Sequence, residues 1–362
     1  MANLLQQIVA GLEAGSYYAL IGLAIVVVMK STDVPNFAQA EMGLFAAYMC
    51  WWLADGEEIG WPFWLAIVVG LTFAAVFGAA VQFFLIRPLT GLSNQPLAVL
   101  AALSLGYALI DLFQDNGLPF FIDWIPGLDG GYPYGVALVL AILCVPIVYI
   151  FMRKFVKKMD NVDHFPLLLL TIGLTFALGS LIEVFFGNNP QKFNTPWSGN
   201  IFNVGDTRIG YDQVISISMG IAIAVGLAIF FRSKWGVRMR AIAEDGTTAR
   251  LLGINAGVIS LLAWAIGSLV AGSAMTLKAG STVLDLGSAE GLILKGFIAA
   301  VLGGFVSLPG TFLGGMVVGV AETVAGGQIS TSLQPTMALL IVVIVLFLYP
   351  QGLTREAKLR EV

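Results

Sequence analysis

Residues 8–29 read IVAGLEAGSYYALIGLAIVVVM, a run of 22 residues in which Glu13 is the only charged side chain. A helix that crosses a membrane needs about 20 mostly apolar residues, because the hydrocarbon core is about 30 Å thick. Runs of this kind recur along the whole chain. The long ones are 37–54, 61–86, 96–113, 134–152, 165–186, 214–231, 258–277 and 333–349, and two shorter Gly-rich runs occupy 292–306 and 311–326.

The composition supports the same interpretation. Of the 362 residues, 58% are hydrophobic and 11% are charged, whereas about 25% are charged in an average soluble domain. Lipid offers no hydrogen-bond partners to the backbone, so each spanning run should be a helix. The polar joints between the runs are short. The sequence therefore predicts an all-α, polytopic bundle in the membrane, with residues 1–362 forming one domain.

Several function classes are disfavoured by what the chain lacks. Its net charge of -4 argues against nucleic acid as a partner. Two cysteines, Cys50 and Cys144, cannot make a zinc site alone, and a single histidine, His164, disfavours a Ser–His pair or a multi-histidine metal site. No Gly-Lys pair occurs, so the chain has no phosphate-binding loop of the Walker type. Residues 1–10 contain no Lys or Arg, so we expect no cleavable signal peptide.

Basic residues set the expected orientation, because Lys and Arg concentrate in cytoplasmic loops. Fourteen of the 18 Lys and Arg residues can be placed on the cytoplasmic side without conflict: Lys30, Arg87 and those in 153–158, 232–250 and 355–360. The N-terminus then lies outside, the C-terminus lies inside, and the number of crossings is odd. Eleven crossings result if both short runs span the membrane, and nine if they form a re-entrant pair. The sequence leaves this choice open.

Five charged residues fall inside the apolar runs: Glu41, Asp111, Glu183, Lys295 and Glu322. A charge at the centre of a membrane helix costs about 2.5–3.5 kcal/mol on insertion scales, so such residues usually face a partner or a cavity. Those near the ends of runs can instead reach the membrane surface. Both readings remain open here.

Residues 303–315 read GGFVSLPGTFLGG. Gly310 and Gly314 are four residues apart, and so are Gly315 and Gly319. Small residues four apart allow helix backbones to approach closely. A broken hairpin at membrane depth is tolerated where it lines a cavity or is buried in protein. The segment predicts either tight helix packing or a re-entrant hairpin.

The cytoplasmic joint 232–257 reads RSKWGVRMRAIAEDGTTARLLGINAG. Residues 238–245 form an amphipathic pattern, residues 247–252 can continue as a short helix, and Gly253 is a typical helix stop. An amphipathic helix at the membrane face suits docking into a groove of a soluble partner. A solvated positive loop is the alternative.

Four segments together resemble the permease subunits of branched-chain amino-acid ABC importers, of the LivH type. They are GSYYALI at 15–21 with NFAQAEMG at 36–43, the joint 232–257, KGFIAAVLGG at 295–304 and YPQGL at 349–353. They occur in the order of the family pattern. The chain departs from that pattern at Gln39 and Ala40, and by two extra apolar spans within 96–152.

The resemblance implies a subunit of the bacterial inner membrane that forms half of a translocation pathway. Its implied partners are a second permease subunit (as a hetero- or homodimer), two cytoplasmic ATPase subunits and a periplasmic substrate-binding protein, in addition to membrane lipid. ATP and Mg²⁺ would be bound by the ATPases, so no cofactor is expected in this chain. The substrate class is a branched-chain amino acid or a related amino acid, amide, urea or organic acid.

The resemblance also assigns site residues. The segment 236–253 would couple to the ATPases through Arg238, Arg240, Glu244, Asp245, Arg250 and Leu252. The substrate pathway would include Asn36, Gln39, Glu41, Lys295 and Glu322. The alternative function is an ion- or proton-coupled secondary transporter that uses Asp111, Glu183 and Glu322.

Overall fold

The computed structural model describes residues 2–32, 35–56, 58–86, 165–205, 207–331 and 334–348. Its helices are α1 (Ala2–Thr32), α2 (Gln39–Ala54), α3 (Phe63–Val81) with the π-helical turn η1 (Gln82–Ile86), α8 (Phe165–Phe186), α9 (Tyr211–Arg232), α10 (Lys234–Glu244), α11 (Gly246–Leu251), α12 (Ala256–Ser281), α13 (Gly287–Leu302), α14 (Leu308–Gln328) and α15 (Gln334–Leu348). Two strands, β1 (Ile201–Val204) and β2 (Thr207–Gly210), form a hairpin.

The helices follow the predicted apolar runs and confirm a polytopic helical membrane protein. Within the described residues, six helices are long and apolar enough to cross a membrane, and α14 is one of them. Helix α13 is shorter, with 16 residues. The expected spans 96–113 and 134–152, which make up the extra pair in 96–152, lie outside the described residues, as does the motif at 349–353.

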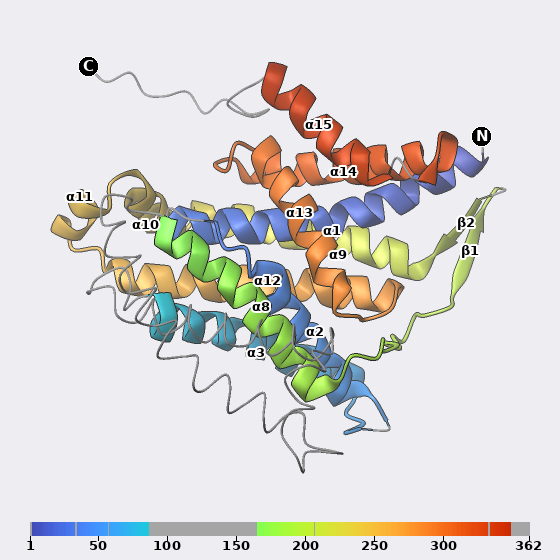
Figure 1. Ribbon diagram of the computed structural model, residues 1–362, viewed down its shortest axis with the longest axis horizontal. Helices are drawn as coiled ribbons and strands as arrows, with labels where there is room; N and C mark the ends of the chain where they lie inside the picture. The colour runs from blue at the N-terminus through green and yellow to red at the C-terminus, as the bar shows by residue number, and fades with distance from the viewer. Residues whose placement is uncertain are drawn as a thin grey trace, which may run out of the picture.

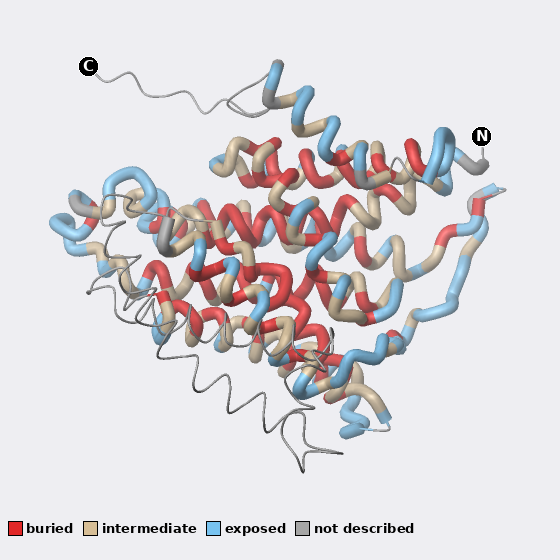
Figure 2. Tube along the Cα trace, viewed as in Figure 1, coloured by how far each residue is buried: buried red, intermediate tan, exposed pale blue. Residues whose placement is uncertain are grey.

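Helix α1 occupies the middle of the bundle, with α14 along one side and α12 along another (Figure 1). Side chains of α1 from Tyr17 to Val28 are almost completely buried, and so are most residues of α2. Figure 2 shows this buried core running through the centre of the bundle, whereas the outer helices are buried on one face. An outer helix such as α9 presents its remaining apolar face to lipid, because lipid tails are as apolar as the side chains on that face.

Helices α1 and α14 pack with their backbones in close contact and run antiparallel. Gly11 and Gly15 of α1 face Val320 and Met316 of α14, and Gly315 of α14 faces Ala19. A Cβ atom at Gly15 would lie 2.8 Å from the Cα atom of Met316. Glycines four apart on both helices create this approach, which is the tight packing that the small-residue spacing predicts.

Helices α13 and α14 form a hairpin whose turn has a clear sequence basis. Gly304, with φ of +64°, places the amide of Phe305 within 2.9 Å of the Ala300 carbonyl, and its own amide bonds to Val301. This is a Schellman ending, in which a left-handed residue closes the helix. The Ser307 side chain then accepts a hydrogen bond from Gly310 N at 3.1 Å and caps α14.

The joint between α8 and α9 differs from the all-helical expectation, because it contains the β1–β2 hairpin. The strands pair antiparallel, with Ile201 opposite Gly210 and Val204 opposite Thr207. Gly205 adopts φ of +61° at the turn, which suits a short hairpin connection. Strand edges are tolerated outside the hydrocarbon layer, where water can bind the free backbone groups. The hairpin lies at the same end of the bundle as the N-terminus, and α10 and α11 lie at the opposite end (Figure 1).

Replacing Gly15 with Val should destabilise the bundle, because the added side chain would meet the backbone of α14. Overpacking of this kind costs about 1–3 kcal/mol or more. The measurement is the thermal unfolding temperature of the purified chain in detergent. Gly226→Val is the matched control, since a Cβ atom at Gly226 would have no neighbour within 4 Å. Equal unfolding temperatures for the two variants would contradict this packing account.

Candidate functional site

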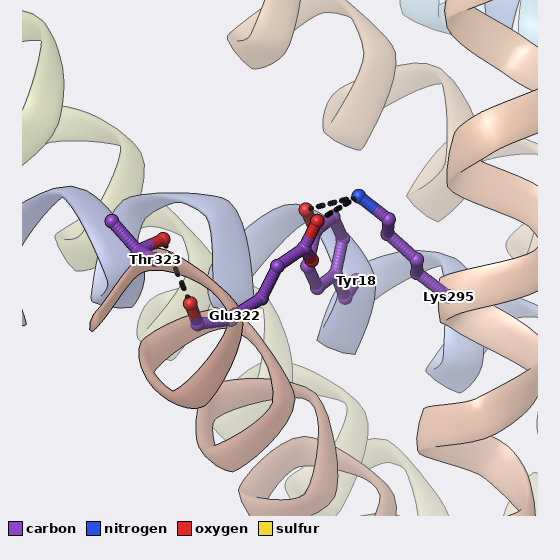
Figure 3. Close-up of polar contacts among 5 residues, drawn as sticks. Tyr18, Lys295, Glu322 and Thr323 are labelled. Atoms are coloured by element: carbon purple, nitrogen blue, oxygen red, sulfur yellow. Dashed lines mark hydrogen bonds and ion pairs between the residues drawn. The ribbon is translucent and has the colours of Figure 1, made fainter. Parts of the chain in front are cut away.

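An ion pair joins the two helices of the α13–α14 hairpin. Nζ of Lys295 on α13 lies 2.5 Å from Oε1 of Glu322 on α14, and it also donates a hydrogen bond to the Tyr18 hydroxyl of α1 at 3.0 Å. Figure 3 shows the three side chains converging from their three helices. The ammonium group also lies over the Tyr18 ring, 4.9 Å from its centroid, which adds a cation–π attraction.

The burial of this pair is asymmetric. The side chain of Glu322 is 7% exposed and that of Lys295 is 23% exposed. The second carboxylate oxygen of Glu322, Oε2, is buried without a hydrogen-bond partner. A buried carboxylate normally accepts several hydrogen bonds, so Glu322 retains an unused acceptor. The two charges neutralise each other in a region where a lone charge would be costly.

A second polar cluster lies at the start of α2. Asn36 Nδ2 donates a hydrogen bond to Gln39 Oε1 at 2.8 Å, and Asn36 Oδ1 accepts one from Ala38 N at 3.0 Å. Asn36, Gln39 and Glu41 are all buried. Nε2 of Gln39 and Oε2 of Glu41 have no hydrogen-bond partner. The Asn36 side chain thus shapes the turn that starts α2, and the cluster keeps unused polar atoms in the core.

An aromatic stack links this cluster to the hairpin. The ring of Phe37 stacks on Phe297 of α13 with centroids 5.4 Å apart, and Phe297 contacts Phe305 in the hairpin turn at 5.3 Å. Phe297 lies two residues after Lys295. Phe37 thus contacts α13 beside the Asn36–Gln39 cluster, whereas Lys295 pairs with Glu322 from a different face of α13.

The remaining acidic candidates lie elsewhere. Glu183 is partly exposed near the end of α8. Asp111 lies outside the described residues. Among the described residues there is no group of three or more His, Cys, Asp or Glu side chains that could hold a metal ion.

Sequence reasoning did not single out a further buried network around Tyr17. The Tyr17 hydroxyl lies 2.8 Å from Oε1 of Glu13 and 3.0 Å from the hydroxyls of both Ser216 and Ser281. These contacts join α1 to α9 and α12. Adjacent residues of a helix point about 100° apart, so Tyr17 and Tyr18 face different neighbours. The Tyr-Tyr pair in an apolar run was the available signal, because buried tyrosine hydroxyls need partners.

The joint 232–257 folds into α10 and α11, as predicted. Arg240 Nη1 donates a hydrogen bond to the carbonyl of Phe231 at 2.6 Å, which ties α10 to the end of α9. Met239 is fully buried and anchors the same helix in the bundle core. Asp245 Oδ1 accepts a hydrogen bond from Thr248 N at 3.0 Å and caps α11. Gly253, with φ of +81°, follows the end of α11.

The outer surface of this joint is apolar and exposed. Leu251 is 84% exposed and Leu252 is 76% exposed. Trp235 is also exposed, with the guanidinium of Arg238 over its ring at 5.1 Å from the centroid. Glu244 and Arg250 are exposed beside them. Leu251 and Trp235 are thus exposed on the joint together with the predicted Leu252, whereas Arg240 bonds to the end of α9 and Asp245 bonds within the joint.

Comparisons with known proteins agree with one another. A sequence model of the family described as "branched-chain amino acid transport system / permease component" matches residues 7–157 and 136–349. The high-affinity branched-chain amino acid transport system permease protein BraD of Pseudomonas aeruginosa is 25% identical over 365 residues, which cover 99% of this chain and 98% of BraD. LivH of Escherichia coli K12, which has the same descriptive name, is 25% identical over 375 residues, with 99% and 97% covered. No solved structure matches the chain.

Replacing Lys295 alone with Met should strongly destabilise the protein, because Glu322 would keep a buried, uncompensated charge. Breaking one side of a buried pair costs about 3–5 kcal/mol. The paired variant Lys295→Met with Glu322→Gln removes both charges and should recover most of the lost stability. The measurement is thermal unfolding in detergent. A single variant as stable as the paired one would contradict the account.

Proposed function

This chain belongs to the permease family of branched-chain amino-acid transport systems, and on that premise we propose that it is a membrane subunit of an ATP-driven importer. It forms half of a translocation pathway together with a second permease subunit. It is a transport subunit and not an enzyme, and ATP hydrolysis belongs to partner subunits. The observation that carries the proposal is the exposed apolar joint α10–α11 on a chain of this family.

The chain is a multi-pass membrane protein of the inner membrane, as its relatives and the six long apolar helices among its described residues indicate. We further propose that the N-terminus and the β1–β2 hairpin lie outside. The distribution of Lys and Arg supports this orientation. The arrangement of the bundle is compatible with it, because the hairpin and the α10–α11 joint lie at opposite ends (Figure 1). A periplasmic binding protein would then deliver its ligand at the hairpin end.

The α10–α11 joint is suited to transmit force from an ATPase. Its outer surface offers Leu251 and Leu252 to a groove on a soluble partner. Its inner surface is fixed, because Arg240 bonds to the end of α9 and Met239 is buried in the core. A displacement of the joint would therefore move α9 and the helices that pack on it.

The substrate assignment follows from the relatives. BraD and LivH are named for branched-chain amino acid transport, and we propose the same substrate class for this chain. A zwitterionic amino acid needs polar groups along its path. The buried side chains of Asn36, Gln39, Glu41 and Glu322 and the partly exposed Lys295 supply them.

The alternative of an ion-coupled secondary transporter receives less support. It would use Asp111, Glu183 and Glu322, but Glu322 is held in an ion pair with Lys295. A carboxylate that exchanges protons or ions during transport would first have to leave that pair. Glu183 lies at a helix end, where it can reach the membrane surface without crossing an apolar layer.

Replacing Leu251 and Leu252 together with Asp should abolish capture of the ATPase subunits, because two charges would enter the apolar docking surface. The measurement is the amount of ATPase that co-purifies with the tagged chain in mild detergent, expected to fall at least tenfold. The control is Ile201→Asp, an apolar residue on β1 that is also exposed and lies at the far end of the bundle. Undiminished capture by the Leu251/Leu252 variant would contradict docking at this joint.

A further inference from the structure

The Lys295–Glu322 pair is open on one side. The side chain of Lys295 is 23% exposed, and Oε2 of Glu322 is buried with no hydrogen-bond partner. The Lys295 side chain is therefore partly open to its surroundings and one oxygen of Glu322 is unused, although the two charges neutralise each other. A pair that served packing alone would be expected to satisfy both carboxylate oxygens.

Open space lies next to the Lys295–Glu322 pair, along α13. Gly291 lies four residues before Lys295, hence one helical turn away on the same face. It is exposed, and a Cβ atom there would have no neighbour within 4 Å. Glu290 and Leu294 are exposed beside it. An exposed carboxylate next to Gly291 is poorly suited to lipid tails, which favours a water-filled path or a subunit interface beside this part of α13.

The charges of the pair restrict which solute can bind between them. A solute with one carboxylate and one ammonium group can replace the single internal pair by two pairs, Lys295 with its carboxylate and Glu322 with its ammonium. No bare charge is then left. A solute with only a positive charge would leave Lys295 uncompensated, and one with only a negative charge would leave Glu322 uncompensated. Each unpaired charge would be costly in the bundle interior.

We propose that Lys295 and Glu322 form a binding site for the charged end of a zwitterionic α-amino acid, with the space beside Gly291 receiving the rest of the molecule. Tyr18 positions the ammonium group of Lys295 through its hydroxyl and its ring. The site selects the zwitterion by charge balance, and the adjoining space accommodates an uncharged side chain. This proposal rests on the proposed importer function and adds a substrate contact to it.

The first test is ATP-dependent uptake of radiolabelled leucine by the complete complex in proteoliposomes. The paired variant Lys295→Met with Glu322→Gln should assemble with the ATPases but lose at least tenfold in uptake. Uptake at the wild-type level by this variant would overturn the binding site and leave a structural ion pair. If the paired variant does not assemble, the variant to test is Lys295→Arg with Glu322→Asp, which keeps both charges but changes the lengths of the two side chains. It should raise KM for leucine at least tenfold, and an unchanged KM would overturn the site.

The second test fills the adjoining space. Gly291→Leu should reduce leucine uptake at least tenfold with normal assembly, since a side chain there meets open space. Gly226→Leu, at a position equally free of neighbours, is the control and should keep full uptake. Full uptake by Gly291→Leu would overturn this part of the proposal.

The third test addresses charge selection without the binding protein. Leucine at millimolar concentration should raise the thermal unfolding temperature of the detergent-solubilised complex, whereas 3-methylbutylamine and 4-methylpentanoate should not. An equal shift from either single-charge analogue would overturn selection by charge balance. Failure of the importer function itself is distinguishable, because wild-type proteoliposomes would then show no ATP-dependent leucine uptake.

Discussion

The close backbone contact between α1 and α14 is the constraint on which the rest of the bundle depends. Gly11 and Gly15 on one helix and Gly315 and Gly319 on the other remove the side chains that would keep the two apart. In lipid, apolar side chains gain little by leaving the solvent, so helix association relies on close packing of this kind. Because α13 is joined to α14 by a short capped turn, this contact also fixes where α13 lies.

The position of α13 in turn brings Lys295 to Glu322 and Tyr18. The pair forms because both hairpin helices and α1 meet at one level, as Figure 3 shows. The α10–α11 joint is tied to the same bundle, since Met239 is buried in the core that contains α1. A displacement of α10–α11 is therefore transmitted through packed side chains to the helices that carry Lys295 and Glu322. This route gives a physical basis for the proposed coupling of ATP hydrolysis to transport.

Much of the fold could be predicted from apolar runs alone. The run 165–186 coincides with α8, Phe165–Phe186, because uniform hydrophobicity marks both ends. The run 292–306 misplaced α13, which begins at Gly287, because Glu290 and the small residues before it lower the hydropathy of a helical segment. The β1–β2 hairpin was not foreseen, since strands of four residues carry too little periodicity to be recognised.

The candidate site was predicted as a set of residues but not as an arrangement. Charge inside an apolar run marked Lys295 and Glu322 individually, but their pairing depends on the turn at 303–307 and on the register of two helices. A single sequence does not specify how two helices are aligned against each other. The joint was predicted as helical because the amphipathic pattern over 238–245 and the stop at Gly253 are local signals. The exposure of Leu251 could be recognised only once the helices were placed against the bundle.

The central claim is that ATP hydrolysis by partner subunits drives an amino acid through this chain. The most direct measurement is leucine uptake by the complete complex in sealed proteoliposomes, with ATP supplied on the cytoplasmic side and an ionophore that dissipates ion gradients. The account predicts uptake that requires ATP and persists with the ionophore. Uptake that needs no ATP and disappears with the ionophore would contradict it and would favour an ion-coupled transporter.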